Sequence, residues 1–341
     1  MAQLLRAAGN GDLEKVIELR GQWGHTNKKG ESALHLAVAE DQLEIVTHLV
    51  AHGAPLNLQD KKNRFTPLML CLAQQPPHFL DMLQAILKGK PDLSVVDSAG
   101  QTVLHLAAQY EEPEAMDIIL RAKPSVDAAD AKRMTALHVA AGKCNVELVK
   151  LLVERGRANV NAVDAKGNSA LHWACIANGD DLVALITYLA AKGAKPLQNA
   201  FGNTPLHSEA MHCESDSAWP TAAAAALSEA FPDLAAEVNK NGLSAQQTFE
   251  QGIDAEEERG GARPPEKAPT GPSKKPARDQ FGAADAGAAD NAAAARAAAI
   301  ARTKKKTGKQ AQSERSALSV YVIVAALLAV LAVAYSMLTA E

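Results

Sequence analysis

Apolar residues with helical spacing recur in short segments along roughly the first three-quarters of the chain. One segment places them at Leu43, Ile45, Val46, Leu49 and Val50. A second segment, Val146–Leu152, repeats this spacing, which is typical of a helix buried along one face. Polar stretches with Gly and Asp separate the segments, so the pattern predicts many short helices joined by turns. We expect Leu151 and Leu171 to lie in the core and Lys150 to face outward.

A four-residue motif recurs between these segments at a nearly constant interval. Each copy begins with Ser or Thr, has Leu third and usually His last, at Ser32–His35, Thr66–Met69, Thr102–His105, Thr135–His138, Ser169–His172 and Thr204–His207. The last residues of successive copies are 34, 36, 33, 34 and 35 positions apart. A period of this length indicates an array of stacked supersecondary units. Such arrays usually present an extended binding surface.

The residues within each unit predict two helices and a projecting turn. The hydroxyl that opens the motif suits a helix N-cap, and Pro67 and Pro205 follow it, where a missing N–H costs nothing. Small residues then allow neighbouring helices to approach closely. We expect Gly53, Gly156 and Gly193 to end second helices in the left-handed conformation. A polar stretch with Asp then turns the chain back towards the next motif.

The copy from Asn145 to Cys175 is the most complete, and with it the sequence resembles the ankyrin repeat, whose signature is Thr-Pro-Leu-His. The resemblance implies an all-α solenoid of helix-turn-helix units with projecting β-hairpin turns, over residues 1–253, with about seven units plus a remnant. It also implies that one histidine per unit links neighbouring hairpins by hydrogen bonds, at His35, His105, His138, His172 and His207. The second unit departs from the pattern, because Met69 replaces the histidine.

Two segments of different composition follow the array. Residues 254–316 are rich in Pro, Gly, Ala and charge and nearly lack large apolar side chains, so we predict a disordered tether. Residues 317–338 carry no charge and are mostly Ala, Val, Leu and Ile. As a helix they would span about 33 Å, enough for the hydrocarbon core of a bilayer. We predict one transmembrane helix there, with 339–341 as a short non-cytosolic tail.

The charge before this span predicts its orientation. Between 296 and 316, Glu314 is the only acidic residue, whereas the basic residues are Arg296, Arg302, Lys304, Lys305, Lys306, Lys309 and Arg315. The positive-inside rule places this side in the cytosol. The arrangement resembles a tail-anchored protein. We expect a single-pass integral membrane protein with a cytosolic N-terminal region, in the endoplasmic reticulum or another secretory-pathway membrane rather than the mitochondrial outer membrane.

Few residues have the spacing that metal binding or catalysis needs. His48 and His52 are four apart, as two metal ligands on a helix would be, but no third ligand lies near them in sequence. His172 and Cys175 could imitate a base and nucleophile, yet they occupy packing positions of the repeat. The sequence has no phosphate-binding or dinucleotide-binding glycine loop. We therefore expect no enzyme activity and no cofactor or metal.

Basic residues concentrate where the turns are expected to project. They are Lys28, Lys29, Lys61, Lys62, Arg64, Lys132, Arg133 and Lys166, and one turn carries Phe201. Over 1–253, 22 basic and 29 acidic residues give a net charge of −7, which argues against nucleic acid as a partner. Two interpretations stay open: a basic stripe that binds a partner, or turns that simply tolerate polar residues. Phe201 is correspondingly either an aromatic anchor or a packed turn residue.

These features predict a membrane-anchored scaffold or adaptor that binds a protein partner through a cytosolic concave surface. The alternative is a regulatory inhibitor that covers the active site of a partner enzyme. Affinity capture, followed by an activity assay of the captured partner, separates the two roles.

Overall fold

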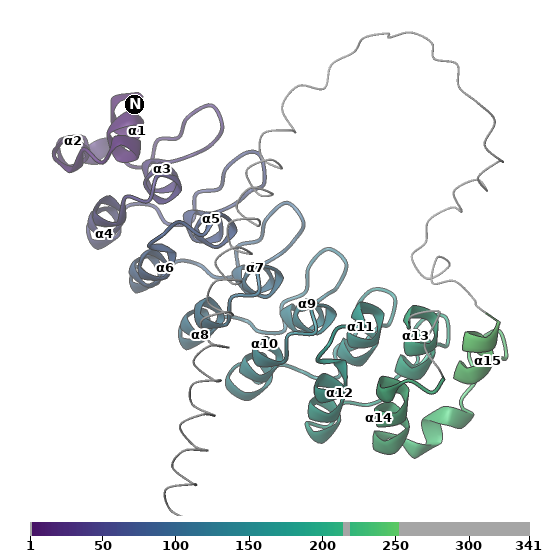
Figure 1. Ribbon diagram of the computed structural model, residues 1–341. Helices are drawn as coiled ribbons and strands as arrows, with labels where there is room; N and C mark the ends of the chain where they lie inside the picture. Colours follow the sequence, from purple (N-terminus) through teal and green to yellow (C-terminus); the bar gives the residue numbers. More distant parts are fainter. Residues whose placement is uncertain (1, 214–218, 252–341) are drawn as a thin grey trace, which may run out of the picture. The chain divides into compact units, whose positions relative to one another are not determined.

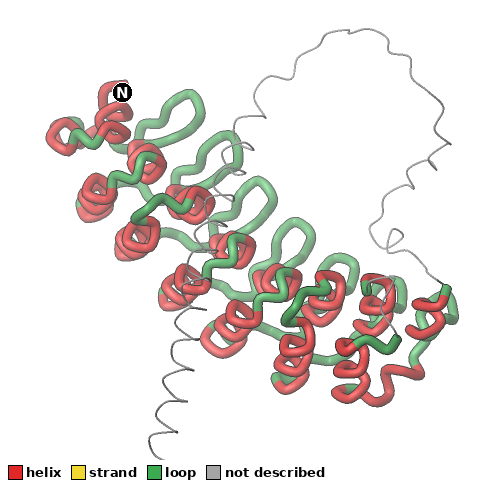
Figure 2. The backbone as a smooth tube through the Cα atoms, in the orientation of Figure 1, coloured by secondary structure: helices red, strands yellow, loops and turns green. Residues whose placement is uncertain are grey.

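The computed structural model describes residues 2–213 and 219–251. Over these residues the chain forms helices and loops with no named strand, as Figure 2 shows, so the predicted all-α class is confirmed for the array. None of the described helices is long and apolar enough to cross a membrane. The predicted tether at 254–316, span at 317–338 and tail at 339–341 lie outside the described residues.

The helices form two rows, and each unit contributes one helix to each row, except the last, of which only α15 is described (Figure 1). The first row comprises α1 (Ala2–Asn10), α3 (Ala33–Ala39), α5 (Pro67–Gln74), α7 (Val103–Gln109), α9 (Ala136–Gly142), α11 (Ala170–Ala177), α13 (Pro205–His212) and α15 (Ala245–Glu250). Each of them contacts the next one in the row. The second row comprises α2 (Leu13–Glu18), α4 (Leu43–Ala51), α6 (Phe79–Lys88), α8 (Pro113–Arg121), α10 (Val146–Lys150), α12 (Leu182–Ala191) and α14 (Ala222–Ala230). A π-helical turn at Leu151–Arg155 continues α10, and 3₁₀ turns lie at Arg20–Gln22 and Pro232–Ala236.

First-row helices begin at the hydroxyl residues of the motif. Ser32 Oγ accepts from the backbone N–H of His35 at 3.4 Å, and Thr66 Oγ1 accepts from that of Met69 at 3.3 Å. These bonds satisfy N–H groups that have no partner inside the helix. Pro205 occupies the first turn of α13, in agreement with the sequence.

Two of the three predicted glycine terminators adopt the left-handed conformation. Gly53 and Gly193 have φ of +80° and +84°. The prediction is wrong for Gly156, whose φ is −77°, because Arg157 takes the left-handed conformation instead, with φ of +57°. A Cβ at Gly156 would lie 2.5 Å from the carbonyl oxygen of Leu152. Glycine is therefore required here because a side chain would not fit, and not because of a positive φ.

The core runs along the array between the two rows. Small side chains let first-row helices approach, and the fully buried ones include Ala37, Ala107, Ala140 and Ala174. Leu171 is 1% exposed, as predicted, and Lys150 is exposed. The prediction is wrong for Leu151, which is half-buried, because Leu152 takes the core position. Leu151 aligns with His48 of α4, which is also half-buried and also precedes a buried leucine.

Loops that we call finger loops project beside the first row and lead into its helices (Figure 2), and the described chain has seven of them. In each, the backbone N–H of the first residue donates to the carbonyl of the last, and the loops span 27–31, 60–65, 97–101, 130–134, 164–168, 199–203 and 239–243. Isolated bridges, Thr26 with Ser32 and Val238 with Ser244, occur only in the first and last loops of the described chain. The predicted β-hairpins are thus tight turns, since so few paired residues cannot form strands.

Candidate functional site

An Asp or Asn side chain fixes the shape of most finger loops. In the loop at 164–168, Oδ1 of Asp164 accepts from the backbone N–H groups of Lys166 and Asn168, both at 2.8 Å. Asp97 and Asn199 make the corresponding bonds in their own loops. Because the side chain imitates a backbone turn, each loop keeps one conformation without help from a strand.

Backbone hydrogen bonds also join each finger loop to the next. The N–H of Lys61 donates to the carbonyl of Lys29 at 2.8 Å, and the N–H of Ala165 donates to that of Lys132 at 3.0 Å. Equivalent bonds connect the remaining neighbours. Gly100, with φ of +77°, shows how close the loops lie, because a Cβ there would be 2.8 Å from the nitrogen of Ala131. The loops therefore form one continuous edge.

The structure places the basic residues predicted from the sequence along this edge. All are exposed: Lys28, Lys29, Lys61, Lys62, Arg64, Lys132, Arg133 and Lys166. Arg64 Nη2 donates to Oε1 of Gln59 at 3.1 Å, so this guanidinium is held beside its own loop. Phe201 is 40% exposed at the tip of the loop at 199–203. The loop at 97–101 carries no basic residue, and it interrupts the series.

The five motif histidines lie inside the array, where each is fully buried. In each, Nδ1 lies within 3.0–3.3 Å of the backbone nitrogen of the residue that opens the motif. Their Nε2 atoms contact backbone carbonyls of the following finger loop at 2.9–3.1 Å, namely those of Phe65, Met134, Asn168, Asn203 and Leu243. Each ring thus spans from its own helix to the next unit.

These contacts fix the protonation of the rings. A backbone N–H can only donate, so Nδ1 must be an acceptor, and a carbonyl can only accept, so Nε2 must carry the proton. The rings are neutral in this arrangement. Burial lowers the pKa of His35, His105 and His138 below the usual 6.5, although the backbone carbonyls and nearby carboxylates oppose this shift. They are therefore structural groups, not acid–base groups for a solvent-borne substrate.

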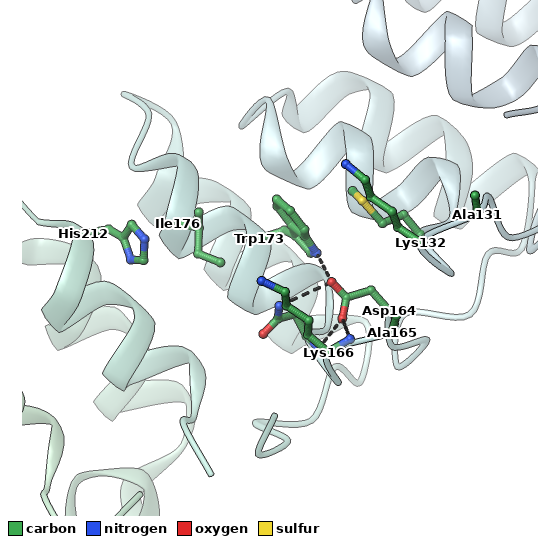
Figure 3. Close-up of a pocket in the computed structure, with 10 residues that line it drawn as sticks. Ala131, Lys132, Asp164, Ala165, Lys166, Trp173, Ile176 and His212 are labelled. Carbon is green, nitrogen blue, oxygen red and sulfur yellow. Dashed lines mark hydrogen bonds between the residues drawn. The ribbon is translucent and has the colours of Figure 1, made fainter. Parts of the chain in front are cut away.

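A hollow of about 680 Å³ lies between the finger loops and the first-row helices near α11 (Figure 3). We call it the Trp173 hollow, and its principal lining residues are Trp173, Ile176, Met134, Lys132, Lys166 and His212. The indole Nε1–H donates to Oδ2 of Asp164 at 3.1 Å. This site was not predicted from the sequence, although Trp173 replaces the aliphatic residue that earlier units carry at that position, such as Leu36 and Leu106.

The candidate chemical pairs show no catalytic or metal-binding arrangement. The rings of His48 and His52 stack with centroids 4.1 Å apart, and no group of three His, Cys, Asp or Glu in the described chain could hold a metal ion. His172 Nε2 lies 3.0 Å from the carbonyl of Asn203, and burial raises the pKa of the Cys175 thiol well above its usual value. Neither residue could serve as base or nucleophile.

A buried carboxyl group in α13 was also missed. Glu209 is 1% exposed and occupies the position where Ala37, Ala107 and Ala140 lie in other units. Its Oε1 accepts from the hydroxyl of Thr221, the N-cap of α14, at 2.7 Å. Burial raises the pKa of this carboxyl above the usual 4.5. Its role in the described structure is to connect the two helices of its unit.

Comparisons with known proteins agree with this architecture. A family model described as ankyrin repeats matches three overlapping stretches, residues 4–93, 73–164 and 104–200. Ankyrin repeat and SOCS box protein 6 of Mus musculus and of Homo sapiens are 38% identical over 73 residues, which is 21% of this chain. That match spans only 17% of the length of these curated relatives. The crystal structure of the ankyrin repeat domain of Bcl-3 is 31% identical, with a TM-score of 0.52, over 60% of this chain and 92% of that one.

Proposed function

Because the chain belongs to the ankyrin-repeat family, we propose that it is a protein-interaction adaptor or scaffold, not an enzyme, whose array recruits a protein partner to a membrane. The finger loops and first-row helices form the binding surface. The predicted span at 317–338 holds the chain in the membrane, with the array in the cytosol, and the segment 254–316 sets its reach. The endoplasmic reticulum or another secretory-pathway membrane is the proposed location.

The observation that carries this proposal is the continuous edge of finger loops. Six inter-loop hydrogen bonds hold the loops in register, so exposed side chains on neighbouring loops keep fixed relative positions. Pre-organised surfaces lose less conformational freedom on binding. The edge carries basic residues on a body of net charge −7 over 1–253, which suits an acidic protein partner that is steered to the loops.

Charge reversal tests whether this edge binds the partner. The test variant reverses Lys61, Lys62, Lys132 and Arg133, and the control variant reverses four exposed lysines at or just after the ends of second-row helices, Lys88, Lys90, Lys123 and Lys195. Both variants gain the same negative charge. We expect only the test variant to associate more slowly, with an effect that weakens as salt shortens the Debye length towards about 8 Å. Association at the wild-type rate by the test variant at two ionic strengths would refute the role of the edge.

The partner for this test is identified by crosslinking mass spectrometry on native membranes. An activity assay of that partner then distinguishes recruitment from inhibition. An adaptor leaves the partner's activity intact and changes its location. Loss of activity on binding would assign the chain the role of a regulatory inhibitor.

Truncation tests the membrane anchor. Removal of 317–341 should release the chain into the soluble fraction, because no described helix could replace the span. Retention of the truncated chain in alkaline-washed membranes would contradict the proposal. A glycosylation sequon added after Glu341 should be modified if that end lies in the lumen, whereas modification of the array would reverse the orientation.

A further inference from the structure

We infer that the Trp173 hollow is a docking site for an extended, acidic partner segment that carries a large apolar side chain beside carboxylates. This inference rests on the proposed function and names the chemistry of the partner. The apolar side chain packs on Trp173 and Ile176 at the floor of the hollow. The carboxylates face the ammonium groups of Lys132 and Lys166 on two successive finger loops (Figure 3).

The floor of the hollow is built around a fixed indole ring. Trp173 is half-buried, and its Nε1–H bond to Asp164 anchors one edge of the ring to the finger loop. On the neighbouring helix α9, a Cβ at Gly142 would lie 3.5 Å from Cε3 of Trp173, so the ring packs directly along that helix. A ring held on two sides offers apolar contact area with little loss of conformational entropy on binding.

Half-buried apolar groups surround the ring. Ile176 lies one turn along α11, and Met134 ends the finger loop at 130–134. Ile176 and Met134 are partly exposed, whereas the first-row alanines Ala140 and Ala174 are fully buried. The hollow therefore has room and apolar surface for one large side chain, which is the usual anchor of a protein interface.

The accessible charge in the hollow is positive. Asp164 is only 5% exposed, and four groups donate to its carboxylate: the N–H of Lys166, the N–H and Nδ2 of Asn168, and Nε1 of Trp173. Its charge is thus compensated from inside. The side chains of Lys132 and Lys166 are exposed.

The two lysines are also held in register with each other. The N–H of Ala165 donates to the carbonyl of Lys132 at 3.0 Å and so joins their finger loops. At the α13 side, Nδ1 of His212 donates to the carbonyl of Ser208 at 2.8 Å, which fixes the position of this ring. A segment with alternating apolar and acidic groups complements this arrangement.

A peptide-display library panned on the full-length protein tests the inference without assuming a sequence. We expect selected peptides to combine Leu, Phe or Met with neighbouring Asp or Glu. A labelled peptide of the selected consensus should then bind at least about tenfold more weakly to Trp173→Leu, which introduces the residue that other units carry and so keeps the fold. Ile176→Glu should weaken binding similarly, because it places a like charge beside the peptide carboxylates.

The charge contribution has its own matched control. The pair Lys132→Gln and Lys166→Gln should weaken peptide binding several-fold at low salt, and less at high salt. The pair Lys88→Gln and Lys123→Gln, exposed at the ends of second-row helices and outside both the hollow and the finger loops, should leave it unchanged. Circular dichroism and urea midpoints equal to wild type confirm that each variant is folded.

Several results would overturn the inference. They are selection of no peptide, selection of basic or uncharged sequences, and consensus binding that the Trp173, Ile176 and lysine variants do not change. Binding of a fluorescent single-stranded RNA oligonucleotide that Trp173→Leu abolishes, with no acidic peptide bound, would assign the hollow to nucleic acid instead. The adaptor role is decided separately, by the charge-reversal test on the finger edge with the crosslinked partner.

Discussion

Replacement of one motif histidine should reveal how strongly the buried rings connect the units. His138→Met is the informative change, because the chain itself carries methionine at this position in its second unit, where Met69 is 2% exposed. Methionine has a side chain of similar length but no ring nitrogens. The substitution therefore retains the bulk of the side chain and removes its hydrogen bonds. The N–H of Thr135, now bonded to Nδ1 at 3.0 Å, would lose its partner.

The structure gives the expected magnitude. Thr135 is 4% exposed, so its unpaired N–H should cost about 1–3 kcal/mol. The carbonyl of Ala162 now lies 3.0 Å from Nε2, and Ala162 is half-buried. Loss of this hydrogen bond should add about 1 kcal/mol to the destabilisation. The carbonyl of Asn168 keeps the N–H of Asp164 as a donor and adds little. We expect His138→Met to lower the free energy of unfolding by roughly 2–4 kcal/mol.

Urea unfolding of the full-length protein, followed by far-ultraviolet circular dichroism, measures this loss at two pH values. The pKa of His138 lies below 6.5 in the folded chain, so the unfolded chain binds more protons there as the pH falls, and the wild type loses stability in that window. The variant lacks this group. The difference between the two proteins should therefore shrink from pH 7.5 to pH 5.

Exposed His25 provides the control, since His25→Met should change stability by less than about 0.5 kcal/mol. A loss below about 1 kcal/mol for His138→Met at pH 7.5, set against the cost of one unsatisfied buried group, would refute the reasoning. A difference that is equal at both pH values would show that the folded ring is not held neutral.

Three further predictions concern the core, a buried carboxyl and a buried thiol. Leu171→Ala should lower the free energy of unfolding by about 2–5 kcal/mol, half-buried Leu151→Ala by clearly less, and exposed Lys150→Ala by under about 0.5 kcal/mol; equal losses in urea would contradict this register. The pKa of Glu209 is raised above 4.5 in the folded chain. The free energy of unfolding therefore falls as the pH rises from the pKa of the unfolded chain through that of the folded chain. Glu209→Gln should therefore stabilise the chain at pH 7 and not at pH 4, and equal urea midpoints at pH 7 would exclude the effect. Burial raises the pKa of Cys71 to about 12, so iodoacetamide at pH 8 should leave it unmodified in the folded protein, as measured by peptide mass mapping; rapid native labelling would show that α5 is open.

The sequence predicts most of the fold because each unit repeats the same local rules. The opening hydroxyl, Pro67 and Pro205 specify where first-row helices begin, and the structure agrees at these positions. The period of the motif specifies the stacking. Leu151 was misplaced because a helical segment with two adjacent leucines fits either one into the core, and only packing against the neighbouring helices selects Leu152.

The candidate site was less predictable. Exposure of Lys61 and Lys132 follows from their places in polar turns, but the hydrogen bonds that align these turns involve backbone groups, which any sequence supplies. Trp173 is the one aromatic residue among those that directly follow the six motif copies, so the sequence alone could have indicated it. Its bond to Asp164 could not be predicted, because it depends on how the finger loop folds back over α11. Glu209 stands where other units carry small apolar residues, but its bond to the hydroxyl of Thr221 depends on how α13 and α14 pack.

The methionine of the second unit divides the array unevenly. Each of the other five motifs sends a ring to the next finger loop, whereas Met69 in α5 sends no polar group to the loop at 97–101. In a linear array, total stability is a sum of unit and nearest-neighbour contributions, so the junction between α5 and α7 (Figure 1) is the place where local opening should cost least. Amide hydrogens from α1 to α6 should accordingly exchange with solvent as one group, ahead of those from α7 to α13.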